Sequence, residues 1–542
     1  MSTTHEVFNQ PPPYEGHNAY AADAALVDAV RREGAAWAEE ELTELGALAG
    51  SPTAIQWGFQ ANENPPVLHT HDRFGNRIDE VAYHPAYHEL MRTAVAYGLH
   101  AAPWADARPG AHVARAAKMI VWSQVDAGHT CPISMTYSVL PALRRQPDVA
   151  AEWEPKLFSR TYDPRPAPVA EKQGAVFGMA MTEKQGGSDV RANTTRAEPT
   201  GTPGEYLLTG HKWFCSAPMS DAFLVLAQAP GGLSCFLLPR RRPDGSRNAM
   251  HIQRLKDKLG DRSNASSEVE YDRAWARLVG EEGQGVRTII EMVNHTRLDC
   301  VLGATATHRH GLAQALHHAA HRQAFGRTLL DQPLMANVLA DLAVEAEAAT
   351  VTALRLARAY DAGPDDEHER LLKRLATPVV KYWVCKRAPV HAAEALECLG
   401  GNGYVEASGL PRIFRQSPLN GIWEGSGNVI CLDVLRAMAR SPESVDAFLA
   451  EVKAAAGAEP RLDAAVTQIE KELSDLDDIE ARARRVVEAM ALAFQASLLV
   501  RHADPAVADA FCASRLDGDA GRAFGTLPPG VDARRIVARS RG

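Results

Sequence analysis

The sequence lacks any apolar run that approaches the ~20 residues needed to cross a bilayer. Its first residues, Met1–Glu6, contain neither the basic stretch nor the apolar stretch of a secretory signal. Basic residues are not in excess either, because 58 Lys and Arg stand against 67 Asp and Glu, a formal net charge of −9. This balance excludes a global attraction to nucleic acid or to an anionic membrane surface. We therefore expect a cytoplasmic protein with no membrane role, in which any nucleic-acid contact is local.

Cysteine is sparse, and its spacing excludes a disulfide framework. The eight cysteines are scattered and include no Cys-x-x-Cys pair, which is typical of reduced thiols in a cytosol. Histidine offers two metal-like spacings, His69 with His71 and His84 with His88. Nothing nearby completes either ligand set, and Pro85 disfavours one continuous helix across the second pair. We predict no metal site.

What is present is an ordinary globular composition, with 46% hydrophobic and 23% charged residues over 542 positions. A chain of this length is expected to form several domains with large cores. Helical spacing of apolar residues alternates with short β-type runs broken by Gly, Pro and Asp. We predict an α+β multidomain protein: an N-terminal arm and helical domain (1–173), a β-barrel or β-sandwich domain (174–280), a helical bundle domain (281–440) and an extra C-terminal helical domain (441–542).

Particular segments support this division. Helical spacing is found in Asp23–Leu48, Tyr87–His100, Ala114–Val125, Arg297–Phe325, Gln332–Tyr360 and His368–Leu399, and β-type runs are Val176–Ala180, Tyr206–Gly210, Ala222–Ala227 and Leu233–Pro239. Residues 1 to about 22 are polar and include Pro11–Pro13, so we expect an arm without regular structure that crosses a neighbouring subunit. In the C-terminal domain, apolar residues recur every seven positions from Leu462 to Met490, which predicts one apolar helical face.

The chemistry centres on a polar, glycine-rich loop, Met181–Asp189, that follows the apolar run Val176–Ala180. Its paired glycines let the backbone approach a flat or anionic ligand closely, and Thr182 and Ser188 add hydroxyls that can hydrogen-bond to it. A motif this short also matches surface turns by chance. The interpretation as a cofactor loop therefore depends on other motifs.

Three further stretches carry residues suited to the same ligand. They are Gly210–Ser216, with an aromatic at Trp213; His321–Gly326, with a cation at Arg322; and a pair of glycine-rich segments, Cys398–Tyr404 and Trp423–Asn428. An indole face can cover a planar ring system. Taken singly, Trp213 would also fit a core aromatic and Arg322 a solvated residue.

At these residues the sequence resembles the acyl-CoA dehydrogenase superfamily, whose signature before the β-domain is apolar-Thr/Ser-Glu-x-x-small-Gly-Ser-Asp. Met181–Asp189 fits it at each position, and the resemblance covers roughly residues 80 to 440 in order. Within the superfamily the chain is similar to the AidB-like branch, associated with the response to DNA alkylation. The narrower resemblance rests on Met181–Val190, Gly210–Phe214, Leu255–Gly260 with Arg262–Ala265, Ile422–Asn428 and the appended C-terminal domain.

The resemblance implies FAD, bound non-covalently between the β-domain and the second helical domain. Trp213 would flank the flavin ring, and Arg322 would meet the pyrophosphate of a partner subunit's FAD, since a guanidinium binds oxyanions in a bidentate manner. The residues implied in cofactor binding are Met181, Thr182, Gly187, Ser188, Trp213, Cys215, Ser216, Arg322, Phe325, Gly400, Gly401, Gly425, Ser426 and Asn428.

Glu424 occupies the position of the family's catalytic base. The implied reaction removes a proton alpha to a thioester carbonyl while a hydride leaves the beta carbon for flavin N5. A carboxylate suits the first task if desolvation raises its pKa toward neutrality. Ser188 and Arg297 would contact the acyl-CoA or a related small molecule. Without the other motifs, Glu424 could equally be a carboxylate that stabilises the N-terminus of a helix. Arg297 could equally be a helix residue in an ordinary salt bridge.

Two departures from the family pattern concern this chemistry. At Cys215 many acyl-CoA dehydrogenases have a Thr whose hydroxyl reaches flavin N5, and a thiol is the weaker hydrogen-bonding group. Asn294 stands where many carry an Asp, three residues before the arginine at 297. Hydride acceptance and the ordinary contacts to CoA are therefore expected to differ from the family pattern.

A second hypothesis is a flavoprotein that binds and protects double-stranded DNA, with little or no turnover of acyl-CoA. Candidate phosphate contacts are Arg436, Arg440, Arg482, Arg484 and Arg485. The acidic run from Glu470 to Glu480 opposes such a role, and a basic cluster is more often a solvated face.

The resemblance also implies a homotetramer in which subunits share FAD contacts. The electron acceptor is left open between an electron-transfer flavoprotein and oxygen. A third hypothesis, an oligomeric scaffold alone, would explain the C-terminal helices but not the loop at Met181–Asp189, and it ranks last.

Overall fold

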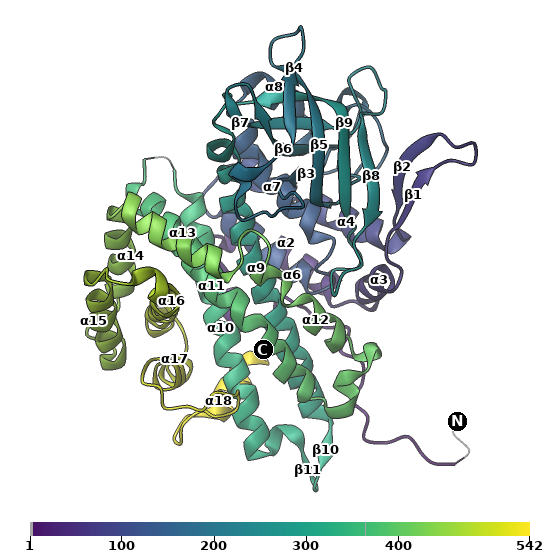
Figure 1. Ribbon diagram of the computed structural model, residues 1–542. Helices are drawn as coiled ribbons and strands as arrows, with labels where there is room; N and C mark the ends of the chain where they lie inside the picture. The colour runs from purple at the N-terminus through teal and green to yellow at the C-terminus, as the bar shows by residue number, and fades with distance from the viewer. Residues whose placement is uncertain (1–3, 364, 542) are drawn as a thin grey trace. The chain divides into compact units, whose positions relative to one another are not determined.

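The computed structural model describes residues 4–363 and 365–541, which form two compact units (Figure 1). The sheet unit comprises Thr53–Ala107 and Val125–Asp299, and the helical unit comprises the chain up to Pro52, Arg108–Gln124 and the chain from Cys300 onward. The segment expected to form one N-terminal helical domain is therefore divided between the two units. None of the described helices is both long and apolar enough to cross a membrane.

A seven-stranded sheet dominates the sheet unit. Its strands are β3 (Phe177–Ala180), β4 (Arg196–Pro199), β5 (Glu205–Ser216), β6 (Ala222–Ala229), β7 (Gly232–Pro239), β8 (Met250–Leu255) and β9 (Ser266–Val279). β5 pairs with β4 and β9, β9 with β7, and β7 with β6, while β6 pairs back to β4. The strands thus close into a ring, which confirms the predicted barrel-like β-domain.

The barrel core follows from the period-two pattern of its strands. Along β5, Tyr206 and Leu208 are buried while Leu207 and Thr209 are half-buried. The inward side chains join one apolar cluster that includes Cys215, Phe223, Phe236, Val269 and Tyr271.

The rest of the sheet unit is helical, apart from one hairpin that the sequence did not predict. The helices are α3 (Pro52–Glu63), α4 (Pro85–Ala96), α5 (Ala102–Ala105), α7 (Thr130–Leu143) and α8 (Pro147–Leu157), and the hairpin is β1 (Val67–His71) with β2 (Arg77–Ala82). Asp72 closes the turn by accepting hydrogen bonds from the amides of Phe74 (2.8 Å) and Asn76 (2.9 Å). Gly75 supplies the positive φ of +86° that the turn requires.

Long helices form the helical unit. They are α1 (Ala24–Arg32), α2 (Glu39–Ala49), α6 (Ala111–Ser123), α9 (Gly285–His321), α10 (Pro333–Asp361), α11 (Glu367–Glu397), α12 (Leu410–Gln416) and α13 (Gly427–Arg440), with the unit boundary falling inside α9. The predicted helix Asp23–Leu48 is two helices, because Gly34 turns the chain with φ +88°. By contrast, α9 is longer than predicted, with 37 residues or about 55 Å.

The N-terminal arm has no helix or strand from residue 4 to 22, as predicted. Within the described chain it contacts the segment after α9: Asn9 donates to the carbonyl of Gln323 (2.9 Å) and accepts from its amide (2.8 Å). His317, near the end of α9, also hydrogen-bonds to the carbonyl of Pro12 (2.8 Å). The arm is thus fixed to the end of α9 and the short hairpin that follows it.

The C-terminal region is helical, as predicted. It contains α14 (Glu443–Lys453), α15 (Pro460–Ser474), α16 (Ile479–His502), α17 (Pro505–Phe511) and α18 (Ala533–Ser540). The heptad pattern from Leu462 to Met490 is divided between α15 and α16 by the acidic turn at residues 475–478. Three elements meet at Glu451 of α14, which accepts hydrogen bonds from Arg355 of α10 (2.6 Å) and Arg501 of α16 (2.6 Å).

We expect these contacts of α14 to weaken in acid. Burial would raise the pKa of Glu451, but hydrogen bonds from Arg355 and Arg501 and their charges outweigh it and lower the pKa from 4.5 to about 2. The stabilisation is therefore complete above pH 4.5 and is lost as the pH falls toward 2. A pKa change of this size corresponds to a loss of about 3 kcal/mol in the free energy of unfolding. Amide hydrogen exchange in α14 and α16, corrected for the intrinsic rate at each pH, measures the loss.

Glu451→Gln provides the control for this acid transition. The variant should show faster exchange in α14 already at neutral pH and a flatter pH dependence. A pH dependence equal to that of the wild type would assign the transition to another carboxylate.

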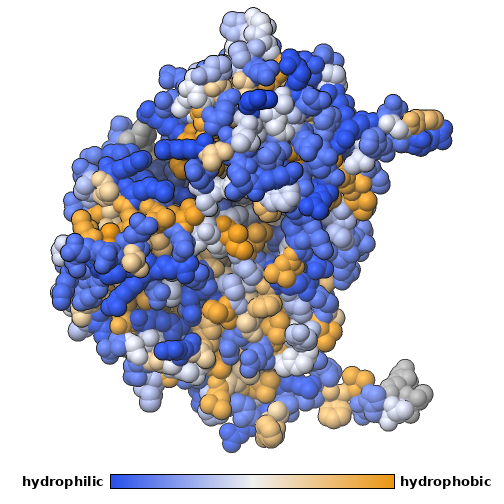
Figure 2. Space-filling model, viewed as in Figure 1, coloured by the Kyte–Doolittle hydropathy of each residue, from blue (hydrophilic) through white to orange (hydrophobic). Residues whose placement is uncertain are grey.

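Large apolar side chains are exposed on part of the helical unit. Figure 2 shows apolar residues gathered on the face that carries α12 and α13. The strongly exposed ones in the helical unit include Phe325 (99%), Leu334 (83%), Tyr404 (83%) and Ile422 (61%). Such exposure marks candidate interaction surfaces.

Candidate active site

The glycine-rich loop leaves the barrel directly after β3. A tight turn follows, in which the amide of Gly186 donates to the carbonyl of Glu183 (3.0 Å) and Gly186 has φ +141°. At Gly187 an added Cβ would lie 2.3 Å from Oγ1 of Thr182, so only glycine allows this close approach. Ser188 is exposed beyond the turn. The loop therefore presents backbone and a hydroxyl to a ligand without an intervening side chain.

A buried ion pair fixes the loop to the barrel. Glu183 and Lys212 are both 0% exposed, and Lys212 Nζ donates to Glu183 Oε1 (2.9 Å). Glu183 also accepts from the amides of Thr194 (2.7 Å) and Thr195 (3.0 Å). Burial would raise the pKa of Glu183, but these hydrogen bonds and the Lys212 charge hold it well below its usual range. Glu183 is thus ionised and serves as the internal anchor of the loop.

Trp213 lies beside the loop on β5. Its amide donates to the carbonyl of Thr182 (2.8 Å), so the structure brings the first two predicted motifs together. The indole is half-buried, and Lys256 Nζ lies 3.3 Å from its ring centroid. Lys184 (5.7 Å) and Arg254 (5.8 Å) are also near the ring. The site therefore combines a planar apolar face with several cations.

The last two residues of β5 differ in orientation. Cys215 is 0% exposed and packs in the barrel core, where burial raises the pKa of its thiol to about 12. Its thiol thus belongs to the core rather than to the surface beside Trp213. Ser216 is half-buried, with its hydroxyl 3.3 Å from that of Ser266.

Arg297, also in the sheet unit, is buried on α9 at 6% exposure.

Glu424 lies in the helical unit, in the turn that precedes α13. Its φ is +58°, a left-handed conformation that costs a residue with a side chain about 1–3 kcal/mol. Gly425 follows with φ +111°, and a Cβ there would lie 2.9 Å from Ile430 Cδ1. The Glu424 side chain is only partly buried. A strained backbone that displays a carboxylate is characteristic of functional sites.

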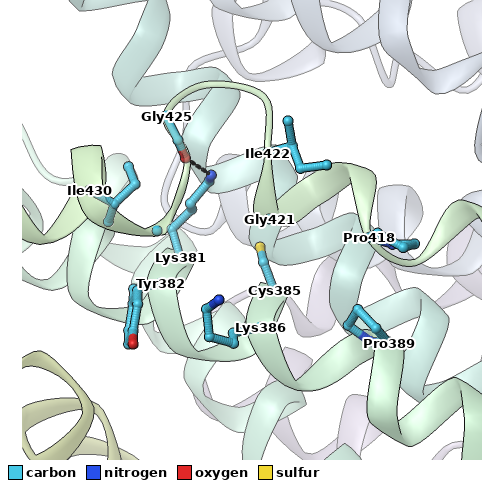
Figure 3. Close-up of a pocket in the computed structure, with 11 residues that line it drawn as sticks. Lys381, Tyr382, Cys385, Lys386, Pro389, Pro418, Gly421, Ile422, Gly425 and Ile430 are labelled. Carbon is cyan, nitrogen blue, oxygen red and sulfur yellow. Dashed lines mark hydrogen bonds between the residues drawn. The ribbon is translucent and has the colours of Figure 1, made fainter. Parts of the chain in front are cut away.

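Residues that the sequence did not single out hold this turn. Trp423 Nε1 donates to Asn420 Oδ1 (2.9 Å), and Gly303 of α9 leaves room for Asn420, since a Cβ would lie 2.9 Å from its Nδ2. Lys381 of α11 donates to the carbonyls of Trp423 (2.9 Å) and Gly425 (2.5 Å) (Figure 3). The sequence offered one sign of this role for Lys381, namely a charged residue within the otherwise apolar run 379–384.

A cavity of about 190 Å³ lies beneath the turn (Figure 3). Its walls come from α11, the turn and the start of α13, and they include Lys381, Tyr382, Lys386, Ile422 and Ile430. Lys381 reaches across one side of it to the carbonyl of Gly425, whereas Lys386 is exposed.

The remaining predicted cofactor residues of the helical unit do not gather at Glu424. Arg322 donates to the carbonyl of Asn9, and Phe325 is 99% exposed with φ +52° in the hairpin β10 (Gln323–Ala324) and β11 (Arg327–Thr328). Figure 1 shows this hairpin far along α10 from the start of α13. Gly400 and Gly401 are exposed, with no atom within 4 Å of an added Cβ. Within one chain these groups form separate clusters.

The five arginines considered for DNA have different environments. Arg482 donates to Glu472 (2.6 Å) and to the carbonyls of Asp475 and Asp477, so its guanidinium is held by the acidic turn. Arg484 Nε donates to Asn428 Oδ1 (2.8 Å), which joins α16 to the start of α13. Arg436, Arg440 and Arg485 are exposed. Arg484 is exposed as well, and Arg485 lies 3.7 Å from Glu472.

The residues from 4 to 541, position 364 excepted, contain no group of three or more His, Cys, Asp and Glu side chains that could hold a metal ion. His308 is instead a packing residue, 0% exposed, with its ring 4.7 Å from that of His391.

Three family descriptions match successive parts of the sequence. Residues 9–164 match "Adaptive response protein AidB N-terminal domain", residues 178–274 match "Acyl-CoA dehydrogenase, middle domain" and residues 283–439 match "Acyl-CoA dehydrogenase, C-terminal domain". Together they cover the predicted N-terminal, β and bundle regions.

Individual relatives agree with these matches. The sequence is 45% identical to AidB of Escherichia coli (strain K12) over 516 residues, which is 95% of each chain. It is 30% identical to acyl-CoA dehydrogenase family member 11 of Caenorhabditis elegans over 492 residues, 83% of this chain and 78% of the relative.

Solved structures show the same fold. A crystal structure of Caenorhabditis elegans ACDH-11 in complex with C11-CoA is 28% identical and covers 99% of this chain and 98% of its own, with a TM-score of 0.87. An acyl-CoA dehydrogenase from Bacillus anthracis complexed with FAD, 16% identical, covers 84% of this chain and 79% of its own, with a TM-score of 0.63.

Proposed function

Because the chain belongs to the acyl-CoA dehydrogenase family, on its AidB-like branch, we propose that it is an FAD-dependent oxidoreductase that acts on an acyl-CoA thioester. The observation that carries the proposal is Glu424, a partly exposed carboxylate on a strained turn, which the resemblance of Ile422–Asn428 assigns as the base. The family name further supports a role in the adaptive response to DNA alkylation.

The residues of the sheet unit fit a flavin. Gly187 lets the loop backbone pack closely against the Thr182 side chain, and the half-buried Trp213 offers a planar face to a ring. Lys184 near that ring suits the phosphates of a dinucleotide, whereas Arg254 and Lys256 each pair with Glu268 at 2.7 Å. Met181, Thr182, Ser188 and Ser216 would line the flavin side of the site, and Ser188 with Arg297 would contact the acyl-CoA.

The helical unit carries its own set of proposed cofactor contacts. Gly425, Ser426 and Asn428 precede or begin α13, where free backbone amides favour an anion. Arg322 and Phe325 lie on the separate β10–β11 hairpin, and Gly400 and Gly401 have open space around them. Their separation from Glu424 supports contacts to a second copy's FAD, and the resemblance extends this to a homotetramer with shared sites.

The chain's own residues would carry the proton side of the reaction. Glu424 would accept the proton alpha to the thioester carbonyl, because a carboxylate in a site emptied of water becomes the stronger base. Bound FAD would supply the acceptor for the hydride from the beta carbon. The family relationship supports an electron-transfer flavoprotein or oxygen as the final acceptor.

A second candidate function is binding of double-stranded DNA. The exposed Arg436 and Arg440 support it, whereas Arg482, Arg484 and Arg485 already have polar partners within the chain. Contacts to phosphates would make the affinity fall steeply with salt, by about one unit of log K per contact for each tenfold increase in salt.

The two candidates separate in one anaerobic experiment. We expect the purified protein to show the visible flavin band, and C11-CoA or isovaleryl-CoA to bleach it. Duplex DNA is titrated in parallel at low and high salt. A flavin that no acyl-CoA bleaches, together with salt-sensitive DNA binding, would overturn the dehydrogenase proposal, and absence of DNA binding even at low salt would remove the second candidate.

A further inference from the structure

Lys381 is a buried cation whose position is unusual. It lies on α11 with 1% exposure, and no ion pair involves it in the part of the chain that the structure describes. Taking an ammonium group out of water is costly unless it finds strong partners. The partners present are two backbone carbonyls, those of Trp423 (2.9 Å) and Gly425 (2.5 Å).

These two carbonyls flank Glu424 on both sides. A single ammonium thus holds the residue before and the residue after it, as Figure 3 shows for Gly425. Glu424 between them has φ +58°, and Gly425 has φ +111°. A left-handed residue with a side chain persists only where its surroundings fix it. The hydrogen bonds of Lys381 are suited to that task, because a charged donor bonds a carbonyl more strongly than a neutral one.

We propose that Lys381 is a positioning residue for Glu424: its ammonium clamps the Trp423 and Gly425 carbonyls and so fixes the direction of the Glu424 carboxylate. The inference rests on the proposed function, in which Glu424 takes the alpha proton. Lys381 itself, buried behind the turn, acts through the backbone and not on the substrate. A misplacement of about 1 Å can cost a reaction about 10²-fold, so a clamp of this kind matters for rate.

Three variants test the clamp. Lys381→Met keeps most of the length of the side chain but removes its donors, whereas Lys381→Arg keeps charged donors. Lys386→Met is the matched control, since Lys386 lines the same cavity on the same helix but is exposed. FAD content and thermal unfolding are measured for each, so that a loss of fold is recognised.

Two readouts separate positioning from a general structural role. In Lys381→Met we expect flavin reduction by saturating acyl-CoA to slow by about 10- to 100-fold, with the acyl-CoA concentration for half-saturation nearly unchanged. Lys381→Arg should recover a large part of the rate, and Lys386→Met should resemble the wild type. Amide hydrogen exchange in residues 419–430 should be faster in Lys381→Met alone.

The outcomes distinguish failure of the clamp from failure of the proposed function. If no acyl-CoA reduced the flavin of the wild-type protein, the proposed function would be overturned. Hydrogen exchange in residues 419–430 would then still test whether Lys381 holds the turn. Unchanged exchange in residues 419–430 of a folded Lys381→Met variant would overturn the inference. An unchanged reduction rate in that variant, with the wild type active, would do the same, and so would an equal loss in Lys386→Met.

Discussion

Glu424→Gln is expected to slow acyl-CoA-driven flavin reduction by about 10²- to 10⁴-fold, the usual contribution of a general base, while FAD stays bound. The amide has nearly the shape of the carboxylate but cannot take up the alpha proton. The substitution should leave the fold intact, because the Glu424 side chain is partly exposed and the turn around it is held by backbone contacts. Anaerobic stopped-flow absorbance of the flavin band measures the rate.

Glu443→Gln is the matched control for this experiment. Glu443 is an exposed glutamate in the first turn of α14, so its neutralisation should leave flavin reduction unchanged. Equal bleaching in Glu424→Gln and the wild type would show that another group is the base. Loss of FAD from Glu424→Gln would instead point to a role in cofactor binding.

Local sequence patterns predicted those helices, strands and loops whose structure depends mainly on neighbouring residues. The loop Met181–Asp189 follows a strand, Trp213 stands on another strand beside it, and the barrel and long helices lie where periodicity placed them. The predicted boundaries were wrong where a turn interrupts the helical spacing of apolar residues. Gly34 divides the first predicted helix, and the acidic turn at 475–478 divides the C-terminal one. The β1–β2 hairpin was missed, although Gly75-Asn76 is a turn signal.

The supports of the candidate site could not be predicted, because they are contacts between residues distant in the sequence. Lys381 is 43 residues before Glu424, and Lys212 is 29 residues after Glu183. No spacing rule joins such pairs. Side-chain direction at Cys215 could not be predicted either: β5 shifts register between Lys212 and Cys215, so the thiol lies on the core side although strict alternation would place it on the face of Trp213.

The two units use the same device to hold their candidate loops. In each, a buried lysine donates to at least one main-chain carbonyl of a glycine-containing loop. Lys212 bonds the carbonyls of Met181 (3.2 Å) and Leu226 (2.8 Å), and Lys381 bonds those of Trp423 and Gly425. They differ in their counter-charge, because Lys212 faces the buried Glu183, whereas the two carbonyls are the partners of Lys381. Loss of Lys212 should therefore be the more damaging to stability.

Lys212→Met is expected to destabilise the barrel by about 3–5 kcal/mol, because it leaves the Glu183 carboxylate buried without its counter-charge. The amides of Thr194 and Thr195 would still bind Glu183, but they carry no full positive charge. Since unfolding of a chain with two units need not be two-state, amide hydrogen exchange in β5 and β6 is the measurement. FAD content should fall as well, because the loop at Met181 loses its anchor.

Two further variants separate charge burial from simple loss of contact. Glu183→Gln combined with Lys212→Met should recover part of the stability, because no unpaired charge then remains in the core. Arg273→Met, which breaks an exposed pair with Glu198 on the same barrel, should change little. If the amides of β5 and β6 exchanged no faster in Lys212→Met than in Arg273→Met, the buried ion pair would not be what fixes the loop. The double variant is decisive for the physical cause: a loss as large as that of Lys212→Met would mean that the lysine acts through its carbonyl contacts rather than its charge.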